Sequence, residues 1–169
     1  MTESIFEPVI EALEAADIRY VVVGGLAVVL HGHARLTADL DLAVDLVPEE
    51  AARAAAALTE LGLRPRVPVD AAALADPDER ARWVRTKGMT VLSFWDPEHP
   101  LRVVDVFVEN PIPFDELWER SERVELSSVP VRIASIPDLI RMKEIAGRPQ
   151  DADDVAALRA IEQHGVDHA

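Results

Sequence analysis

The stretch that decides the fold is VGGLAVVLHGHARLTADLDL, residues 23–42. Its start, with the apolar residues before it, predicts a short buried strand at 20–23 that stops at the two glycines. The residues that follow, 26–31, predict a compact helix closed by a glycine, the residue that most readily ends helices. From 37 to 46 apolar and polar residues alternate, which predicts a strand with one buried face.

Asp39 and Asp41 are the informative pair of that alternating strand, on the face that also carries Thr37. Side chains at positions i and i+2 of a strand point to the same side, with α-carbons about 6.6 Å apart. Two carboxylates so placed can bind one Mg²⁺, which takes oxygen ligands, or hold two cations in neighbouring positions. The polar outer face of an edge strand explains the pair equally well, so the surrounding sequence has to decide.

Two further features favour a binding site. Gly24 and Gly25 let backbone amides approach a phosphate closely, and the N-terminus of the following helix adds partial positive charge. Asp105 lies within the apolar run 101–108, where a charge is costly unless it is paired or bound to a metal. Each feature also has a plainer explanation, a tight turn without ligand and an acid on a wet sheet face. Together they predict a glycine turn for a triphosphate beside three carboxylates.

The rest of the chain predicts an α/β (α+β) fold, a mixed sheet flanked by helices with a helical C-terminus. Residues 64–87 give the weakest pattern, because three prolines interrupt them. We expect a single domain, 1–169, with a mixed-sheet core at 1–134 and C-terminal helices at 135–169. Periodicity indicates helices at 3–16, 48–61, 78–85, 114–121, 137–146 and 151–163, and further strands at 90–95, 101–108, 124–126 and 129–134.

Composition sets limits on location and chemistry. The chain of 169 residues has no cysteine, which excludes disulfides and thiolate-bound zinc. Its first fifteen residues carry four glutamates and no lysine or arginine, unlike a secretory or transit peptide. The longest apolar run, 20–30, is shorter than the roughly 20 residues of a membrane span. We therefore expect a cytoplasmic location and no membrane partner.

The net charge of −14 bears on partners. Proteins bind nucleic acids mainly through lysines and arginines that neutralise phosphates, so this charge disfavours a dedicated nucleic-acid binder. The one basic cluster lies at 80–87, where neighbouring acids favour a solvated helix face over a binding patch. Acidic residues at 151–154 are explained at this level by their place in the first turn of a helix, where they complement the helix dipole.

The sequence resembles the signature of the DNA polymerase beta-type nucleotidyltransferase superfamily. The resemblance consists of the glycine pair, thirteen intervening residues, the motif Asp39-Leu40-Asp41-Leu42 and the later Asp105. Residues 23–42 are similar to the AbiEii-like and minimal nucleotidyltransferases of bacteria, and 138–143 and 146–154 echo the C-terminal part of those families. Many superfamily members have Gly-Ser where this chain has two glycines, so a serine contact to the triphosphate is missing.

The resemblance implies a nucleotidyltransferase fold and a two-metal reaction. Asp39 and Asp41 would hold two Mg²⁺ ions, with Mn²⁺ as the alternative, and Asp105 would complete one site and accept the proton of the incoming hydroxyl. Arg35 and Lys143 are candidates for contacting the phosphates of an NTP. An exposed loop arginine and a solvated helical lysine are equally good readings. Thr37 could contact a phosphate, although a role in capping the strand is slightly favoured.

The function that follows is transfer of a nucleoside monophosphate from an NTP to an acceptor hydroxyl on a protein, a tRNA or a small molecule. The charge balance favours a protein or small-molecule acceptor, and the resemblance suggests a toxin–antitoxin component with a cognate toxin or antitoxin partner. The alternative is a catalytically inactive module of the same fold that binds nucleotide or protein. A glycosyltransferase is disfavoured because the chain is short and the glycine turn precedes the acidic strand.

Overall fold

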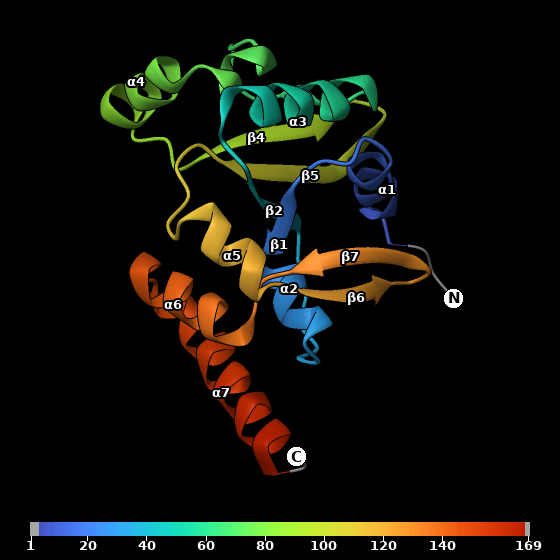
Figure 1. Cartoon of the computed structure of the whole chain (residues 1–169), viewed down its shortest axis with the longest axis vertical. Coiled ribbons are helices and arrows are strands. Elements are labelled where there is room, and N and C mark those ends of the chain that lie inside the picture. Colours follow the sequence, from blue (N-terminus) through green and yellow to red (C-terminus); the bar gives the residue numbers. More distant parts are fainter. Residues whose placement is uncertain (1–3, 168–169) are drawn as a thin grey trace.

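A computed structural model describes residues 4–167 and shows one mixed sheet with helices around it (Figure 1). In that part of the chain the sheet has seven strands in the order β3-β4-β5-β2-β1-β7-β6. β2 pairs in parallel with β5 and β1 with β7, whereas the other neighbours are antiparallel. The strands are β1 (Tyr20–Val23), β2 (Asp39–Val44), β3 (Arg64–Pro65), β4 (Val91–Asp96), β5 (His99–Phe107), β6 (Glu122–Leu126) and β7 (Val129–Ile133).

Helices lie on both faces of the sheet. α1 and α3 lie on one face, whereas α5 lies on the other, beside β1, and α6 contacts α5 (Figure 1). α7 follows α6 and forms the C-terminal arm of the molecule. The helices are α1 (Glu7–Ala15), α2 (Gly24–Leu30), α3 (Pro48–Glu60), α4 (Pro77–Lys87), α5 (Phe114–Arg120), α6 (Ile136–Ala146) and α7 (Ala152–Asp167), with short 3₁₀ turns η1 (Ala71–Ala75) and η2 (Pro149–Asp151).

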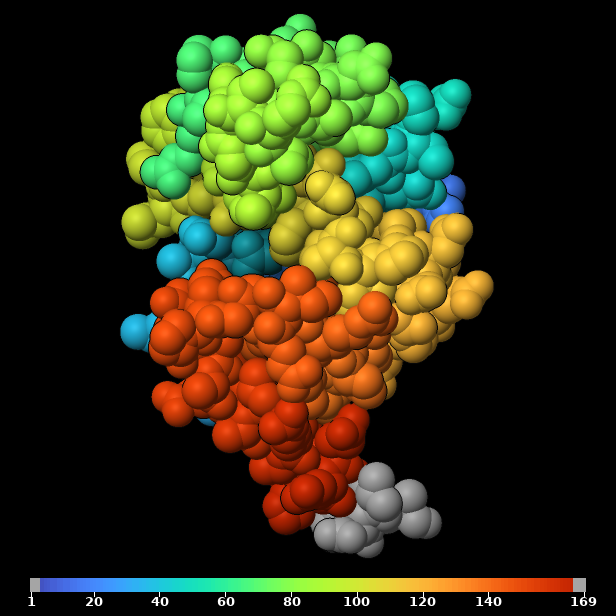
Figure 2. All heavy atoms as spheres, turned by 90° about the vertical axis from the view of Figure 1, so that its left-hand side faces the viewer, coloured from blue at the N-terminus to red at the C-terminus, as the bar shows by residue number. Residues whose placement is uncertain are grey.

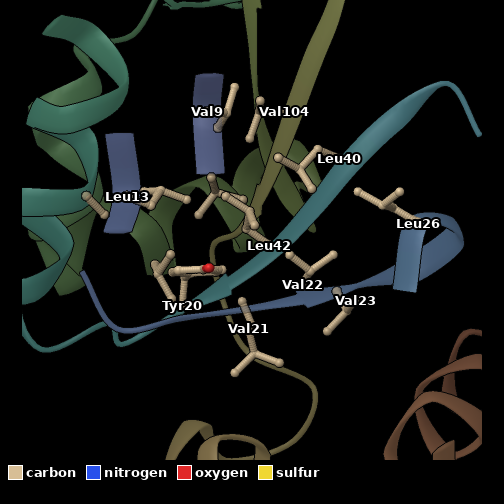
Figure 3. Close-up of a cluster of buried hydrophobic side chains, with 14 of the residues drawn as sticks. Val9, Leu13, Tyr20, Val21, Val22, Val23, Leu26, Leu40, Leu42 and Val104 are labelled. Carbon is tan, nitrogen blue, oxygen red and sulfur yellow. The ribbon is translucent and has the colours of Figure 1, made fainter. Parts of the chain in front are cut away.

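The main core lies between the sheet and α1. Val22 and Leu42 point from neighbouring strands toward Leu13 of α1, and all three side chains are fully buried (Figure 3). The next side chains along β1, Val21 and Val23, point to the other side of the sheet, where α5 and α6 lie (Figure 3). The centre of the sheet is therefore buried on both faces at β1, as its continuous apolar run requires.

α6 begins and ends at residues suited to helix termini. The Ser135 side chain accepts a hydrogen bond from the Asp138 backbone N–H at 3.3 Å, and Gly147 ends the helix with a φ of 62°. In addition, the buried Asp138 carboxylate accepts two hydrogen bonds from Arg120 of α5, each 2.9 Å long. These contacts fix α6, which carries Lys143, against α5.

The expected fold class is confirmed, and the differences lie at the ends of elements. β2 covers 39–44 rather than 37–46, and α2 begins at the first glycine of the pair rather than after it. β3 and η1 lie within the proline-broken stretch and were not predicted. At the start of η1 the Asp70 side chain accepts a hydrogen bond from the Ala72 backbone N–H at 2.9 Å. This local hydrogen bond favours the turn, although the sequence there has no hydrophobic periodicity.

The basic cluster at 80–87 lies on α4, as expected. Arg82 pairs with Glu79 at 2.7 Å, and Arg80 donates hydrogen bonds to the backbone oxygens of Leu74 and Leu46. Two of its four cations are therefore already engaged within the molecule. Among residues 4–167, no helix combines the length and the apolar character needed to cross a membrane.

Candidate active site

Three carboxylates that are remote along the chain meet on one face of the sheet. The pairing of β2 and β5 sets Asp41 opposite Asp105 and Asp39 opposite Val103. Paired residues of neighbouring strands point to the same side, so Asp41 and Asp105 are side by side and Asp39 is one step along the same face. The expected convergence of the three acids therefore occurs in the fold, which is what the two-metal hypothesis required.

The charges of this cluster act on one another. Burial raises the pKa of Asp41 to about 7, and the negative charges of Asp105 and Asp39 add to that effect. Burial also raises the pKa of Asp105, although a hydrogen bond that its Oδ1 accepts from Ser93 Oγ at 2.5 Å acts in the opposite direction. The fold thus holds carboxylates together against their mutual repulsion, a cost that a bound cation would remove.

The chemistry of the donor set suits a hard cation, because all three side chains offer carboxylate oxygens. One of the Asp105 oxygens is engaged by Ser93. As the side chains are placed, residues 4–167 contain no group of three or more His, Cys, Asp or Glu that could hold a metal ion. The three side chains offer the oxygen ligands and the negative charge that Mg²⁺ prefers, but as placed they do not surround a common metal position.

The glycine turn approaches the acid cluster closely. A β-carbon on Gly24 would lie 2.0 Å from Asp41 Oδ2, and the residue has a φ of +68°, a conformation that favours glycine. A β-carbon on Gly25 would lie 2.9 Å from Thr37 Oγ1 and 3.4 Å from Arg35 Cζ. The turn is therefore in contact with the acidic strand and with two of the residues expected to bind a nucleotide.

Thr37 and Arg35 both have partners within the protein. Thr37 Oγ1 donates to the backbone oxygen of Asp39 at 3.2 Å, which is the strand-capping role that the sequence slightly favoured. Arg35 pairs with Asp154, a buried acid of α7, and its Nε donates to the backbone oxygen of Leu36 at 3.0 Å. The loop before β2 is thereby tied to the C-terminal helix.

Lys143 is buried rather than solvated. Its Nζ lies 3.0 Å from Asp154 Oδ2 and 3.3 Å from Asp151 Oδ1, and only 7% of its side chain is exposed. Arg148 pairs with Asp151 as well, at 2.9 Å. The positive charges of Arg148 and Lys143 both lower the pKa of Asp41, so the cations of α6 and its C-terminal turn act on the acid cluster.

The expectation for the acids at 151–154 needs correction. Asp153 is exposed in the first turn of α7, where the helix dipole explains it. Asp151 and Asp154 are 5% and 4% exposed and make ion pairs, so the dipole alone does not account for them. A buried charge is costly unless it is paired, and these two acids supply the pairing for Lys143 and Arg35.

One cation near the acids was missed by the sequence analysis. The backbone N–H of Arg66 donates to the Ser93 oxygen at 2.9 Å, which continues the pairing of β3 with β4 and sets Arg66 beside Ser93. Its charge lowers the pKa of Asp105. In the described part of the chain, neither Arg66 nor Arg64 forms an ion pair. Only the strand pairing reveals this placement, since the local sequence is broken by prolines.

Figure 2 shows the face of the molecule that lies on the left-hand side of Figure 1. The blue to teal residues of α2, the loop after it and the start of β2 lie in a notch there. Above them are the green and olive residues of the β3–β5 part of the molecule, and below them the orange to red residues of α6 and α7. The segment that carries the glycine turn, Asp39 and Asp41 therefore reaches the surface between these two parts of the molecule.

Comparison with solved structures shows the same fold in two antibiotic-modifying enzymes. The crystal structure of the lincosamide antibiotic adenylyltransferase LnuA with lincomycin bound matches with a TM-score of 0.60 and 15% identity, over 90% of this chain and 93% of LnuA. The crystal structure of ANT(2″)-Ia in complex with adenylyl-2″-tobramycin matches with a TM-score of 0.55 and 15% identity, over 94% of this chain and 91% of that protein. No curated protein matches the sequence.

A family model gives the more direct assignment. Residues 3–168 match the model described as nucleotidyltransferase of unknown function, DUF6036. The match spans nearly the whole chain, including the glycine turn, the three acids and the helices that carry Lys143 and Arg148. The chain therefore belongs to this family of nucleotidyltransferases.

Proposed function

We propose that this protein transfers a nucleoside monophosphate from an NTP to an acceptor hydroxyl. The observation that carries the proposal is the meeting of Asp39, Asp41 and Asp105 on one sheet face, directly beside a glycine turn in which Gly24 has a φ of +68°. The acceptor oxygen forms a bond to the α-phosphorus, the bond from that phosphorus to the bridging oxygen breaks, and pyrophosphate leaves. The proton of the hydroxyl passes to a carboxylate of the cluster.

The three acids have defined roles in this proposal. Asp39 and Asp41 would hold two Mg²⁺ ions, or Mn²⁺, and Asp105 would complete one of the sites. The metal would supply charge neutralisation at the attacking and leaving oxygens of the displacement. Asp105 is the acid placed to accept the proton, because Ser93 already orients its carboxylate and leaves the second oxygen free of that hydrogen bond.

The nucleotide belongs on the side of the cluster where the glycine turn lies. A side chain at Gly24 would collide with Asp41 and one at Gly25 with Thr37, so glycine at both positions lets the backbone of the turn lie directly beside the acidic strand. Arg35 and Lys143 stand on the same side and are held by Asp154. Their positive charge favours a triphosphate there, and their ion pairs keep the side chains in place before it binds.

The acceptor in this proposal is a small molecule. The net charge of −14 opposes a polyanion such as tRNA, and the two structural neighbours were solved with lincomycin and with adenylyl-2″-tobramycin, both small. A protein hydroxyl, with a toxin or antitoxin as partner, stays a prediction from the family resemblance. If the acceptor is a protein, the labelled nucleotide would appear in a polypeptide.

The experiment measures transfer from α-³²P-labelled ATP, GTP, CTP and UTP in the presence of Mg²⁺ and a cell extract separated into small molecules, RNA and protein. We expect labelled product with the wild type and none with the Asp39→Asn/Asp41→Asn double variant. Asp153→Asn, which changes an exposed acid of α7, is the matched control and should retain transfer. Equal labelling by the double variant would disprove the role of the acids.

A module without turnover is the second candidate, and one observation favours it. As their side chains are placed, the acids do not form a metal-binding group within the described residues. Such a module would bind an NTP without releasing pyrophosphate. Calorimetric binding of ATP together with an absence of pyrophosphate release at every Mg²⁺ and Mn²⁺ concentration would select this alternative.

A further inference from the structure

The sheet face that carries the acids is covered on one side of them and open on the other. Val21 and Val23 of β1 point from this face toward α5 and α6 and are buried (Figure 3). On β4 and β5, in contrast, Ser93, Trp95 and Phe107 are only partly buried, although Val103 between them is buried. The opposite face of the same strands is closed, because Phe94 and its neighbours there are fully buried.

Strand pairing resolves the open part of this face into two rows. The first row runs from Arg66 through Ser93 and Asp105 to Asp41. The second row runs beside it and consists of Arg64, Trp95, Val103 and Asp39. The first row therefore leads from Asp105 across Ser93 to Arg66, and the second leads from Asp39 across two neutral residues to Arg64. We call these two rows, without the acids, the edge platform: Arg64, Arg66, Ser93, Trp95 and Val103.

Cations on the two sides of the acids differ in one respect. On the glycine side, Arg35, Lys143 and Arg148 are all ion-paired with Asp151 or Asp154. On the edge platform, Arg64 and Arg66 form no ion pair with any described residue. Arg64 and Arg66 are exposed and lie two residues apart, so their positive charges are available to a negative ligand.

Other acids near the edge platform do not cancel this charge. Asp96, at the end of β4, is buried on the opposite face and paired with Arg102 at 2.9 Å. The acids on the platform's own face are Asp39, Asp41 and Asp105, and the charge of Arg66 lowers the pKa of Asp105. An anionic ligand would therefore meet Arg66 at the sheet edge and keep its negative group away from the carboxylates.

We propose that the edge platform binds the acceptor and that the acceptor is a small hydroxyl compound with an anionic group, a phosphate or a carboxylate. This inference rests on the proposed function and specifies its acceptor. The anionic group faces Arg66 and Arg64, a ring of the acceptor lies on Trp95, and the hydroxyl reaches Asp105. Charge-assisted hydrogen bonds to arginine and the flat aromatic surface supply the recognition.

The test uses two matched sets of hydroxyl compounds that differ in charge. One set is glucose 6-phosphate, glucose and glucosamine, and the other is 4-hydroxyphenylacetate, 4-hydroxyphenylacetamide and tyramine. Calorimetry on the full chain with Mg²⁺ measures binding, and release of pyrophosphate from ATP measures turnover. We expect the anionic member of at least one set to bind about tenfold more tightly than its neutral analogue, the effect of one charged hydrogen bond.

Variants connect that preference to the platform. Arg66→Gln should abolish the preference for the anionic member, and Arg66→Lys should retain part of it. Arg85→Gln, which changes an exposed arginine of α4 that forms no ion pair with a described residue, should leave the preference unchanged. Equal affinity within both sets, a preference for the cationic members, or no binding of any compound would overturn the inference.

Failure of this inference is distinguishable from failure of the proposed function. Pyrophosphate release that is faster with neutral or cationic compounds would keep the nucleotidyltransferase and reject the anionic acceptor. Charge-selective binding that depends on Arg66, without any pyrophosphate release, would keep the platform as an anion site and reject turnover.

Discussion

The two faces of β2 and β5 differ in nearly every physical respect, although their residues alternate along the same strands. On one face Leu40, Leu42 and Val104 are fully buried in the core. On the other, Asp41 and Asp105 are held side by side with raised pKa values. The apolar face therefore stabilises the strand pairing strongly enough to hold negative charges together on the opposite face, where the reaction is proposed to occur.

The largest effect on stability is expected from the apolar face. Leu42→Ala removes a fully buried side chain from beneath α1 and should lower the free energy of unfolding by about 2–5 kcal/mol. Leu36→Ala, at a leucine that is 95% exposed, should change it by less than about 0.5 kcal/mol. Urea unfolding followed by circular dichroism measures both. Similar losses for the two variants would show that the core at β2 does not carry the strand pairing.

The acidic face should give a smaller effect that depends on pH. The pKa of Asp41 is raised in the folded state, to about 7 from an ordinary value of 3.8, so between these values the folded state binds more protons than the unfolded state. The contribution of Asp41 to the free energy of unfolding is fully present below pH 3.8 and is lost as the pH rises through 7. Stability should therefore fall between about pH 5.5 and pH 8, by on the order of 2 kcal/mol.

Asp41→Asn tests the assignment of that pH dependence. The amide cannot titrate, so the variant should lose most of the slope between these pH values and equal or exceed the wild type in stability at the higher one. Asp153→Asn should keep the wild-type slope. A slope that persists in Asp41→Asn would place the titration elsewhere. Asp96 and Asp151, whose pKa values are lowered, lose their contributions only in more acidic solution.

The smallest change in stability is expected at the glycine turn, where the comparison is between neighbouring residues. Gly24→Ala forces an alanine into a φ of +68°, at a cost of about 1–2 kcal/mol, and pushes Asp41 aside because its β-carbon would lie 2.0 Å from Oδ2. The rate of nucleotide transfer should fall by a larger factor than this loss of stability alone would cause. Gly25→Ala meets the ends of the Thr37 and Arg35 side chains, which can move, and should cost less on both measures.

Thermal unfolding and initial rates of label transfer distinguish the two glycine variants. Equal losses of transfer in Gly24→Ala and Gly25→Ala would show that the turn acts through its flexibility and not through its distance from Asp41.

Much of the acidic face could be predicted from the sequence. The alternation at 37–46 predicts that Asp39 and Asp41 share a face, because the strand period is two. The placement of Asp105 in an apolar run predicts a special role, but not which strand lies beside it. That neighbour is set by tertiary pairing, which local pattern does not encode.

The position of Arg66 and the ion-pair partners of Lys143 could not be predicted from the sequence. Arg66 is flanked by prolines within two residues, so no periodicity indicates the edge strand that carries it next to Ser93. The acids in the first turn of α7 can be explained by their interaction with the helix dipole alone, so the sequence does not indicate that they have ion-pair partners. Their burial depends on how α6 and α7 pack, since this packing brings Lys143 to Asp154.

The side-by-side pairing of β2 and β5 has a consequence for folding. Parallel neighbours cannot be joined by a tight turn, so the long segment from α3 through β4 forms the connection that brings Asp105 beside Asp41. Contacts between segments so distant along the polypeptide form slowly, because a long loop has to close first. Recovery of transfer activity during refolding should therefore trail the return of helical signal, which makes enzymatic turnover a reporter of completed topology.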